Sequence, residues 1–229
     1  SIESLENTIE SFHYSKSLGC EFIETDVQVS SDGIPYIFHD ETLTRLLNRD
    51  DVFSSLHSSE IDNLKIFDEH SIPKLETVLR MFPDMKFQID VKTDEVAMPA
   101  LAVIQENNAM DRVCIASFNS KRLNLVNNNY PDICISMGPY EVAKMLLSSF
   151  GLYKKSILGN CLQIPIYEYG IKLVTKRFVK FIHSKGLKVC VWTINDEKTF
   201  KYLIDIGVDG IITDKPKLLF EVLDSATNQ

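Results

Sequence analysis

The chain of 229 residues lacks the excess of Lys and Arg that would attract a polyanion. It carries 24 Lys and Arg against 32 Asp and Glu, a formal net charge of −8 at pH 7. Because phosphate backbones and anionic membrane surfaces repel such a protein, this balance argues against nucleic acid or an anionic membrane surface as the partner. It leaves room for a local basic pocket that binds a single phosphate on a small molecule.

Paired cysteines and long apolar runs are also missing. The five cysteines are odd in number and widely spaced, with no Cys-x-x-Cys pair. We therefore expect reduced thiols and a reducing compartment, the cytoplasm. No apolar run approaches the ~20 residues that a bilayer span needs, and no signal peptide is recognisable. The chain begins at Ser1 rather than at a methionine, so we expect a further segment upstream in the natural protein. The oligomeric state stays open.

The sequence does contain a regular alternation of short strand-like runs with helix-like segments, which is the pattern of parallel β-α units. Several of the strand-like runs are apolar on both faces, as strands between a barrel core and its surrounding helices are. Seven runs are predicted as parallel strands: 22–29, 86–92, 112–117, 132–137, 161–165, 188–194 and 210–213.

This pattern predicts an α/β fold, a TIM (β/α)8 barrel, as a single domain over residues 1–229. Such a barrel needs eight parallel strands, and the chain opens with a helix-like segment instead. We therefore expect these residues to lack the first strand. Residues 41–72 have no clear periodicity, and we interpret them as a small insertion above the barrel.

The stretch 21–40, EFIETDVQVSSDGIPYIFHD, places carboxylates inside an otherwise apolar strand. Glu24 and Asp26 share one face because side chains alternate along a strand. Asp32-Gly33 is a strong hairpin signal, so the run that follows should fold back antiparallel. With these two residues as the loop, Asp26 lies opposite His39. Both carboxylates and the imidazole then converge at the carboxyl end of the strand, where active sites form in parallel α/β folds.

A third carboxylate, Asp90, lies in the next predicted strand, with Lys92 on the same face. Inward carboxylates repel one another unless a cation or a proton joins them. Three oxygen donors suit Mg²⁺ or Ca²⁺ rather than zinc. Beside such a metal, Lys92 would neutralise phosphoryl oxygens and His39 would move a proton, which indicates phosphate chemistry.

Structural alternatives stay open for these residues. Glu24 and Asp26 also fit an exposed, salt-bridged surface, and His39 fits the plain end of a hairpin. Asp90 and Lys92 also fit an internal ion pair. Trp192, the single tryptophan, suits a core position and a ligand platform equally well. The apolar stretch MLLSSFGLY, residues 145–153, favours a buried helix over a path for an acyl chain.

An ordered series of motifs spans the chain: LENTIESF, the block EFIETDVQVSSDGIPYIFHDETLTR, SIPKLETVL, IDVK, ASF, VWTIND and GVDGIITDKP. In this order the series resembles the glycerophosphodiester phosphodiesterase family from end to end. The resemblance implies a TIM-barrel enzyme that hydrolyses glycerophosphodiesters to glycerol 3-phosphate and an alcohol. It also implies roles for single residues: a divalent metal on Glu24, Asp26 and Asp90, catalysis by His39 and Lys92, and substrate binding by Lys92, which contacts the phosphate, and by Asn7 and Trp192.

Two features depart from the family pattern. Asp90 stands where the family usually has Glu, one methylene longer. The His-Arg-Gly triplet, which supplies the family's other acid/base histidine and a phosphate-binding arginine, does not occur in the 229 residues. We expect that triplet upstream of Ser1.

Two further functional readings follow from the resemblance. LQIPIYEYG is similar to the branch of the family with lysophospholipase D activity on lysophospholipids. If the natural protein truly lacks the His-Arg-Gly triplet, the chain is instead a catalytically silent barrel that binds a phosphorylated ligand.

Overall fold

The computed structural model describes residues 3–227, which form two compact units. The N-terminal unit is Leu5–Cys134, and the C-terminal unit is Ile135–Gln229 together with Ser1–Ser4. All five cysteines are free thiols, one buried and four half-buried. None of the helices within residues 3–227 is long and apolar enough to cross a membrane.

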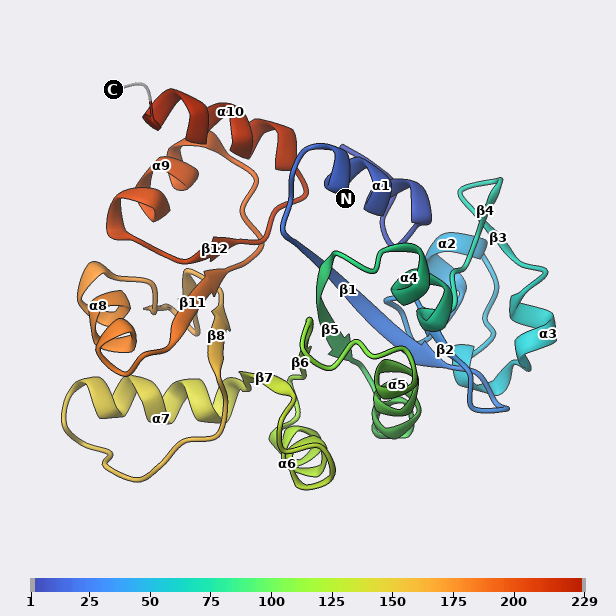
Figure 1. The fold of residues 1–229 in the computed structure, drawn as a ribbon, viewed down its shortest axis with the longest axis horizontal. Helices are drawn as coiled ribbons and strands as arrows, with labels where there is room; N and C mark the ends of the chain where they lie inside the picture. The colour runs from blue at the N-terminus through green and yellow to red at the C-terminus, as the bar shows by residue number, and fades with distance from the viewer. Residues whose placement is uncertain (1–2, 228–229) are drawn as a thin grey trace. The chain divides into compact units, whose positions relative to one another are not determined.

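In the N-terminal unit the long strand β1 (Phe22–Val29) forms the centre of the sheet (Figure 1). The short strand β2 (Pro35–Ile37) pairs with it antiparallel on one side. On the other side β5 (Lys86–Val91) pairs with it parallel, and β6 (Val113–Ala116) continues the sheet. The register of β1 and β5 places Asp26 directly beside Asp90, so both carboxylates reach the same end of the sheet.

Four helices accompany this sheet: α1 (Ile9–Ser17), α4 (Leu75–Met81), α5 (Asp94–Glu106) and α6 (Ser120–Asn129). Side-chain caps fix where three of them begin. Thr8 accepts the backbone N–H of Ser11 at the start of α1, and Thr93 and Asn119 cap α5 and α6 in the same way. Such caps satisfy backbone donors that have no partner within the helix. The start of α1 matters for function because Asn7 immediately precedes its cap.

Residues 41–72 are built from short elements, which explains why no periodicity is visible in the sequence. They form α2 (Thr44–Leu47), the 3₁₀ turn η1 (Phe53–Ser55), α3 (Ser58–Ile61) and the hairpin of β3 (Lys65–Ile66) with β4 (His70–Ser71). These elements enclose a small hydrophobic core of their own: Tyr36, Phe38, Leu43, Phe53, Leu56, Ile61, Ile66 and Ile72.

The Phe53 side chain is the centre of this small core and gives a first prediction. It is fully buried and stacks on Phe38 with ring centroids 4.8 Å apart. Phe53→Ala should lower the free energy of unfolding by about 3–5 kcal/mol, because a cavity replaces the ring. Chemical denaturation measures the change. The neighbouring Val52 is 48% exposed, so Val52→Ala is the matched control and should change stability little; equal losses in both variants would contradict this packing.

The hairpin between β1 and β2 differs by one residue from the predicted register. Val27 pairs with Ile37 and Gln28 with Tyr36, and the Phe38 N–H donates to the Asp26 carbonyl at 3.0 Å. Phe38, not His39, therefore lies opposite Asp26, and the predicted register was wrong. The loop has three residues, 31–33, closed by the Ser30 N–H bonding the Ile34 carbonyl at 3.0 Å.

Local chemistry explains the longer loop. Gly33 has φ +88°, the left-handed conformation that ends a three-residue hairpin loop. The Asp32 carboxylate accepts the Ser58 N–H at 2.9 Å and the Ser58 hydroxyl at 2.6 Å. These bonds hold the pKa of Asp32 far below its usual range. They tie the hairpin tip to α3, a long-range contact that the Asp-Gly signal alone does not reveal.

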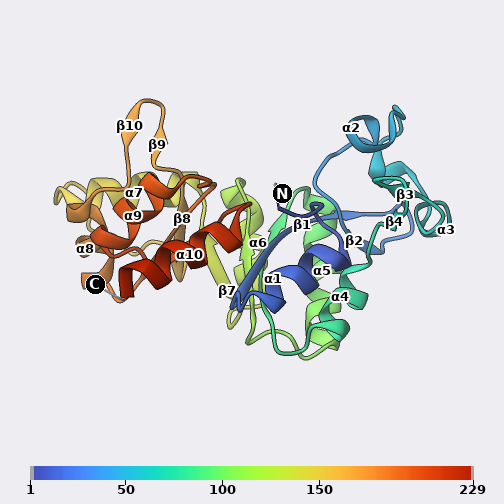
Figure 2. The same ribbon diagram turned by 90° about the horizontal axis from the view of Figure 1, so that it is seen from above.

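In the C-terminal unit four parallel strands form the sheet: β7 (Cys134–Met137), β8 (Cys161–Ile164), β11 (Lys188–Val191) and β12 (Gly210–Ile211). The helices are α7 (Pro139–Ser149), α8 (Lys176–Ser184), α9 (Glu197–Ile206) and α10 (Pro216–Thr227). A small hairpin of β9 (Tyr167–Glu168) and β10 (Ile171–Lys172) stands out from this unit (Figure 2). This hairpin is not among the elements predicted from the sequence.

All seven parallel strands predicted from the sequence are confirmed, each within a few residues at its ends. Within residues 3–227 no strand precedes α1, as the helix-like opening segment predicts.

Candidate active site

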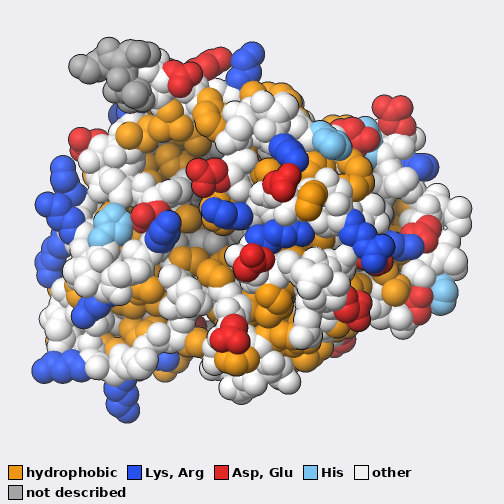
Figure 3. Space-filling model, viewed as in Figure 1, with side chains coloured by type: hydrophobic (Ala, Val, Ile, Leu, Met, Phe, Trp, Pro, Cys, Tyr) orange, Lys and Arg blue, Asp and Glu red, His pale blue; other side chains and the backbone are white. Residues whose placement is uncertain are grey.

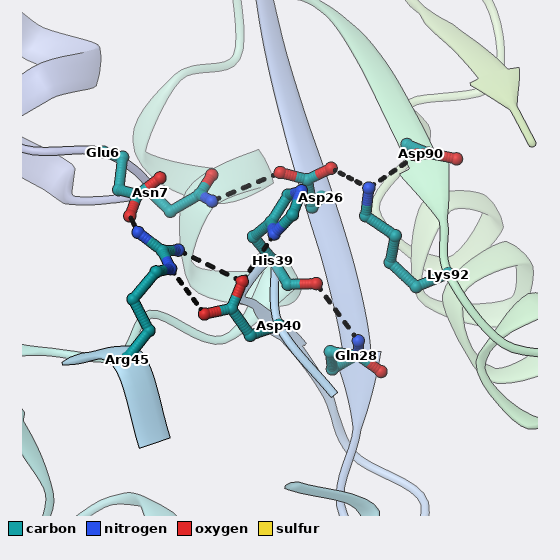
Figure 4. Close-up of polar contacts among 9 residues, drawn as sticks. All are labelled: Glu6, Asn7, Asp26, Gln28, His39, Asp40, Arg45, Asp90 and Lys92. Carbon is teal, nitrogen blue, oxygen red and sulfur yellow. Dashed lines mark hydrogen bonds and ion pairs between the residues drawn. The ribbon is translucent and has the colours of Figure 1, made fainter. Parts of the chain in front are cut away.

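Asp26 and Asp90 form the buried centre of the candidate site. They lie side by side on β1 and β5 and are only 8% and 6% exposed. The Lys92 ammonium joins them: its Nζ lies 2.7 Å from Asp26 Oδ1 and 2.8 Å from Asp90 Oδ2 (Figure 4). The ion pair that the sequence left open for Asp90 and Lys92 thus forms, and it includes Asp26 as well.

Electrostatics in this cluster follow from burial and from the balance of charge. Burial raises the pKa of the Asp90 carboxyl, and Lys92 offsets only part of that effect. Burial alone would lower the pKa of Lys92, but the two carboxylates outweigh it and raise the pKa. Two carboxylates against one ammonium leave a net negative charge in a poorly solvated place. A hard divalent cation fits such an oxygen-rich, negatively charged centre.

Asn7 holds the Asp26 carboxylate from the side of α1. Its Nδ2 lies 3.4 Å from Asp26 Oδ2, and its Oδ1 accepts the Thr25 hydroxyl at 2.7 Å. Asn7 has φ +55°, a left-handed conformation that Asn adopts more readily than most residues. The amide therefore orients Asp26 while it faces the same centre.

His39 is held from two sides at the end of the hairpin. Its carbonyl accepts Gln28 Nε2 at 3.3 Å, and its Nδ1 lies 2.6 Å from Asp40 Oδ1. With Asp40 ionised, Nδ1 carries the proton of this bond, so Nε2 is the nitrogen left to exchange a proton. The imidazole is half-exposed and thus open to a ligand.

Asp40 is in turn fixed by Arg45 of α2. Arg45 Nε and Nη2 bond the two Asp40 oxygens at 2.6 and 3.2 Å, and Nη1 pairs with Glu6. Burial raises the pKa of Asp40, but the bonds from Arg45 and His39 prevail and lower it. Asp40 therefore stays ionised and keeps His39 in one orientation.

Asp40→Asn tests this positioning role. The amide can present its nitrogen to Nδ1, which favours the opposite tautomer of His39 and removes the basic form of Nε2. We expect kcat to fall about 10–100-fold, as for other residues that orient a functional side chain, and the acidic limb of the pH profile to shift. Asp51→Asn, which changes an arginine-bound carboxylate within the insertion, is the control. An unchanged pH profile in Asp40→Asn would contradict the role.

Glu24 lies two residues before Asp26 on β1, in register with Gln88 of β5. Its side chain is exposed. Among residues 3–227, the carboxylate oxygens of Glu24, Asp26 and Asp90 do not form a group that all lie within 4.8 Å of one another. The structure thus brings Asp26, Asp90, Lys92 and Asn7 together, whereas the Glu24 carboxylate does not join Asp26 and Asp90 in one close group.

Trp192 belongs to the C-terminal unit, where it follows β11. It is half-buried, and its backbone N–H donates to the Ile164 carbonyl at 3.2 Å. Near it, Asn195 accepts the Asp214 N–H at 2.9 Å and donates to the Asp214 carboxylate at 2.8 Å. These two bonds join the segments that follow β11 and β12.

Sequence reasoning missed the roles of Glu6, Gln28 and Arg45. Arg45 had one usable signal, its place five residues after Asp40 in the block DETLTR. The spacing does not show that the segment turns back onto the hairpin. For Gln28 the signal is strand alternation, which places it on the same face of β1 as Glu24 and Asp26.

A family model for the glycerophosphoryl diester phosphodiesterase family matches residues 1–218. The chain belongs to this family. It is 31% identical over 226 residues to probable glycerophosphodiester phosphodiesterase 2 of Mycobacterium tuberculosis, a match that covers 95% of this chain and 84% of that protein. A glycerophosphodiester phosphodiesterase of Caldanaerobacter subterraneus is 28% identical, with 95% and 92% covered.

Solved structures agree on the fold of this glycerophosphoryl diester phosphodiesterase. A phosphodiesterase of Oleispira antarctica, solved with the product sn-glycerol-3-phosphate, superposes with a TM-score of 0.82 at 24% identity and covers 98% of this chain. The superposition shows the α/β TIM-barrel fold of the family, and the family match together with the 31% identical relative makes the chain a phosphodiesterase, a hydrolase of phosphoric diesters.

Proposed function

We propose that the protein is a divalent-metal-dependent glycerophosphodiester phosphodiesterase, which hydrolyses glycerophosphodiesters to glycerol 3-phosphate and an alcohol. One observation carries the proposal. Two buried carboxylates lie in register on adjacent parallel strands and share the Lys92 ammonium, in the same unit as a histidine whose tautomer is set by Asp40. This arrangement supplies an anionic centre for a metal, a cation for phosphate and a proton carrier.

Asp26 and Asp90 would hold the metal, with Glu24 as the third carboxylate, and Mg²⁺ or Ca²⁺ is the ion that oxygen donors favour. When bound, such a metal neutralises phosphoryl oxygens and stabilises the charge that develops during hydrolysis. Lys92 adds a second positive charge for the phosphate, and its ammonium stays protonated because its pKa is raised.

His39 is the proposed acid/base group. Its Nε2 takes a proton from an attacking hydroxyl or gives one to the leaving alcohol, while Asp40 holds the proton on Nδ1. Asn7 keeps the Asp26 carboxylate in place and offers an amide to the substrate. Trp192 is proposed as a substrate-binding residue for the glycerol moiety, and the supporting observation is that its side chain is only half-buried.

The named substrate rests on the relatives. The two relatives described above carry the name glycerophosphodiester phosphodiesterase, and the Oleispira antarctica enzyme binds glycerol 3-phosphate as product. A human lysophospholipase D is a more distant relative at 22% identity, with 97% of this chain and 82% of that protein covered. Lysophospholipid hydrolysis is therefore the runner-up activity.

The choice between these substrates is tested with the full-length protein. Initial rates are measured on glycerophosphocholine and on lysophosphatidylcholine, each with Mg²⁺, with Ca²⁺ and with a chelator. We expect the higher kcat/KM on glycerophosphocholine and no turnover in chelator. A preference for lysophosphatidylcholine would move the enzyme to the lysophospholipase D branch. A folded, metal-loaded protein that hydrolyses neither would instead be a phospho-ligand-binding barrel.

Glu24→Ala examines the third proposed ligand. We expect the metal concentration for half-maximal activity to rise at least about tenfold, because one anionic donor is lost. Titration of metal into the chelated protein measures this directly, by calorimetry as well as by activity. Glu21→Ala removes an exposed carboxylate three residues away and should leave the titration unchanged. A titration that Glu24→Ala leaves unaltered would remove Glu24 from the site.

A further inference from the structure

Charge is distributed very unevenly along this acidic chain. Residues 142–195 contain nine Lys and Arg and a single acidic residue, Glu168. This segment therefore carries +8 within a chain whose net charge is −8. All of it lies in the C-terminal unit, and none of it takes part in the cluster of Asp26, Asp90 and Lys92.

The structure gathers part of this charge on α8 and on the loop after α7. Arg177 and Phe181 lie four residues apart and share one face of α8, and Lys185, which caps the C-terminal end of the helix, lies 5.3 Å from the Phe181 ring centroid. Lys154 and Lys155 lie in the loop that follows α7. In Figure 3 Lys and Arg side chains gather at the left edge, over α8 and this loop.

Contacts tie these two elements into one surface. The Arg177 guanidinium lies 4.7 Å from the Phe150 ring centroid, and its Nη2 donates to the Ser149 carbonyl at 3.3 Å. At the C-terminal end of α8, Lys185 lines a hollow of about 390 Å³ together with Lys154, Lys155 and Tyr153. Ser148 and Ser156 add hydroxyl groups to the same hollow.

Large apolar side chains lie exposed between these cations. Leu147 is 45% exposed, Phe150 57% and Leu152 74%. The stretch MLLSSFGLY is therefore buried only at its start, where Met145 and Leu146 pack on the core. The prediction of a buried helix holds for the first half of the stretch and fails for the second.

The cations of this surface have no acidic neighbours to satisfy them. Among the residues that the structure describes, Lys154, Lys155, Arg177, Lys180 and Lys185 have no carboxylate oxygen within 4.0 Å. By contrast Lys176, one turn away, pairs with Asp205 at 3.9 Å. A surface with several unneutralised cations around exposed apolar groups is suited to a partner that is both anionic and apolar.

We propose that this surface, made of Leu147, Phe150, Leu152, Lys154, Lys155, Arg177, Lys180 and Lys185, docks the enzyme on an anionic phospholipid bilayer. The cations face lipid head groups, each contributing to attraction toward the negative surface. Phe150, Leu147 and Leu152 enter the boundary between head groups and acyl chains, as exposed aromatic and aliphatic groups of peripheral proteins do. The two contributions act together, since one of them alone gives weak and reversible binding.

The apolar residues favour a bilayer over a soluble polyanion. A nucleic acid or an acidic protein would be bound by the lysines and Arg177, but it would leave Leu147 and Leu152 in water. The net charge of the whole chain predicts that an anionic membrane repels the protein. The positive charge concentrated on this one surface reverses that prediction, because this surface is the part that meets the membrane.

Co-sedimentation of the full-length protein with vesicles tests the proposal. Vesicles of phosphatidylcholine alone are compared with vesicles in which about a third of the lipid is phosphatidylglycerol, so that their surface potential is negative. We expect binding only to the anionic vesicles. Lys154→Glu, Lys155→Glu and Lys185→Glu combined should weaken partitioning at least about a hundredfold, from the loss of three surface cations. Phe150→Ser with Leu152→Ser should weaken it about tenfold or more and make the remainder sensitive to salt.

The matched control reverses three exposed lysines elsewhere, Lys65→Glu, Lys121→Glu and Lys198→Glu, with the same change of net charge. It should bind vesicles like the wild type. Circular dichroism confirms that each variant folds. Failure of the wild type to bind anionic vesicles would overturn the proposal, as would equal losses in patch and control variants. The proposal would also be overturned if the protein bound heparin as tightly as anionic vesicles and if Phe150→Ser with Leu152→Ser left that binding unchanged. Such a result would indicate a soluble polyanion as the partner.

Discussion

His39→Ala should lower kcat for glycerophosphodiester hydrolysis by about 10²–10⁴-fold, the usual effect of removing a general acid or base. The side chain is half-exposed and its Nδ1 is engaged by Asp40, so only Nε2 can exchange a proton with the substrate. KM should change far less, because the proposed contact to phosphate comes from Lys92. Steady-state kinetics on glycerophosphocholine measure both constants.

The control for this variant is His13→Ala. His13 is exposed on α1, and its ring packs on Phe82 at 4.7 Å, away from the proton chemistry proposed for His39. We expect nearly wild-type kinetics from it. If His39→Ala retained more than a tenth of the wild-type kcat, His39 would have no acid/base role and the site would need another proton carrier.

Asp90→Asn should abolish metal-dependent turnover without harming the fold. We expect activity to fall by at least about a hundredfold, since a bound metal supplies several kcal/mol of transition-state stabilisation. At pH 7 and in chelator, the same variant should be at least as stable as the wild type. Enzyme kinetics and thermal unfolding of the same sample measure the two effects.

The pH dependence of this gain follows from the raised pKa of Asp90. An unfolded Asp has a pKa of about 3.9, and burial raises the value in the folded state. The ionised carboxylate therefore costs stability once the pH exceeds both values, and that cost disappears as the pH falls through them. The advantage of Asp90→Asn should thus be present at pH 7 and vanish below pH ~4.

Asp111→Asn is the matched control, because Asp111 is an exposed carboxylate of the same unit. It should change neither activity nor the pH dependence of unfolding. A wild type that is more stable than Asp90→Asn at pH 7 in chelator would mean that the bond to Lys92 outweighs the burial of Asp90. That result would contradict the proposed electrostatics of the cluster.

The strands could be predicted from the sequence because their signal is local. Apolar runs such as 22–29 and 86–92 alternate with helical segments, which predicts adjacent parallel strands. Parallel pairing of these two strands then places Asp26 beside Asp90. The register of the β1–β2 hairpin could not be read so simply. The register depends on the hydrogen bonds from Ser58 to the Asp32 carboxylate. These two residues are 26 positions apart, so a local sequence pattern does not reveal the contact.

In the candidate site too, the residues with a local sequence signal could be predicted and those placed by long-range contacts could not. Asp26 and Asp90 within their strands, and Lys92 directly after β5, occupy the places that alternation implies. Arg45 and Glu6 depend on how the insertion folds back, which short, aperiodic elements do not reveal. The charged surface on α8 was hidden for a different reason, since a net charge averages over the whole chain and carries no information about position.

The most direct test of the central claim follows the products of glycerophosphocholine by ³¹P NMR, using the full-length protein before and after chelation. We expect that glycerol 3-phosphate appears, that chelation stops its formation, and that Mg²⁺ or Ca²⁺ restores it. A folded, metal-supplied protein that leaves glycerophosphocholine intact would contradict a metal-dependent phosphodiesterase, and so would undiminished product formation in the chelator.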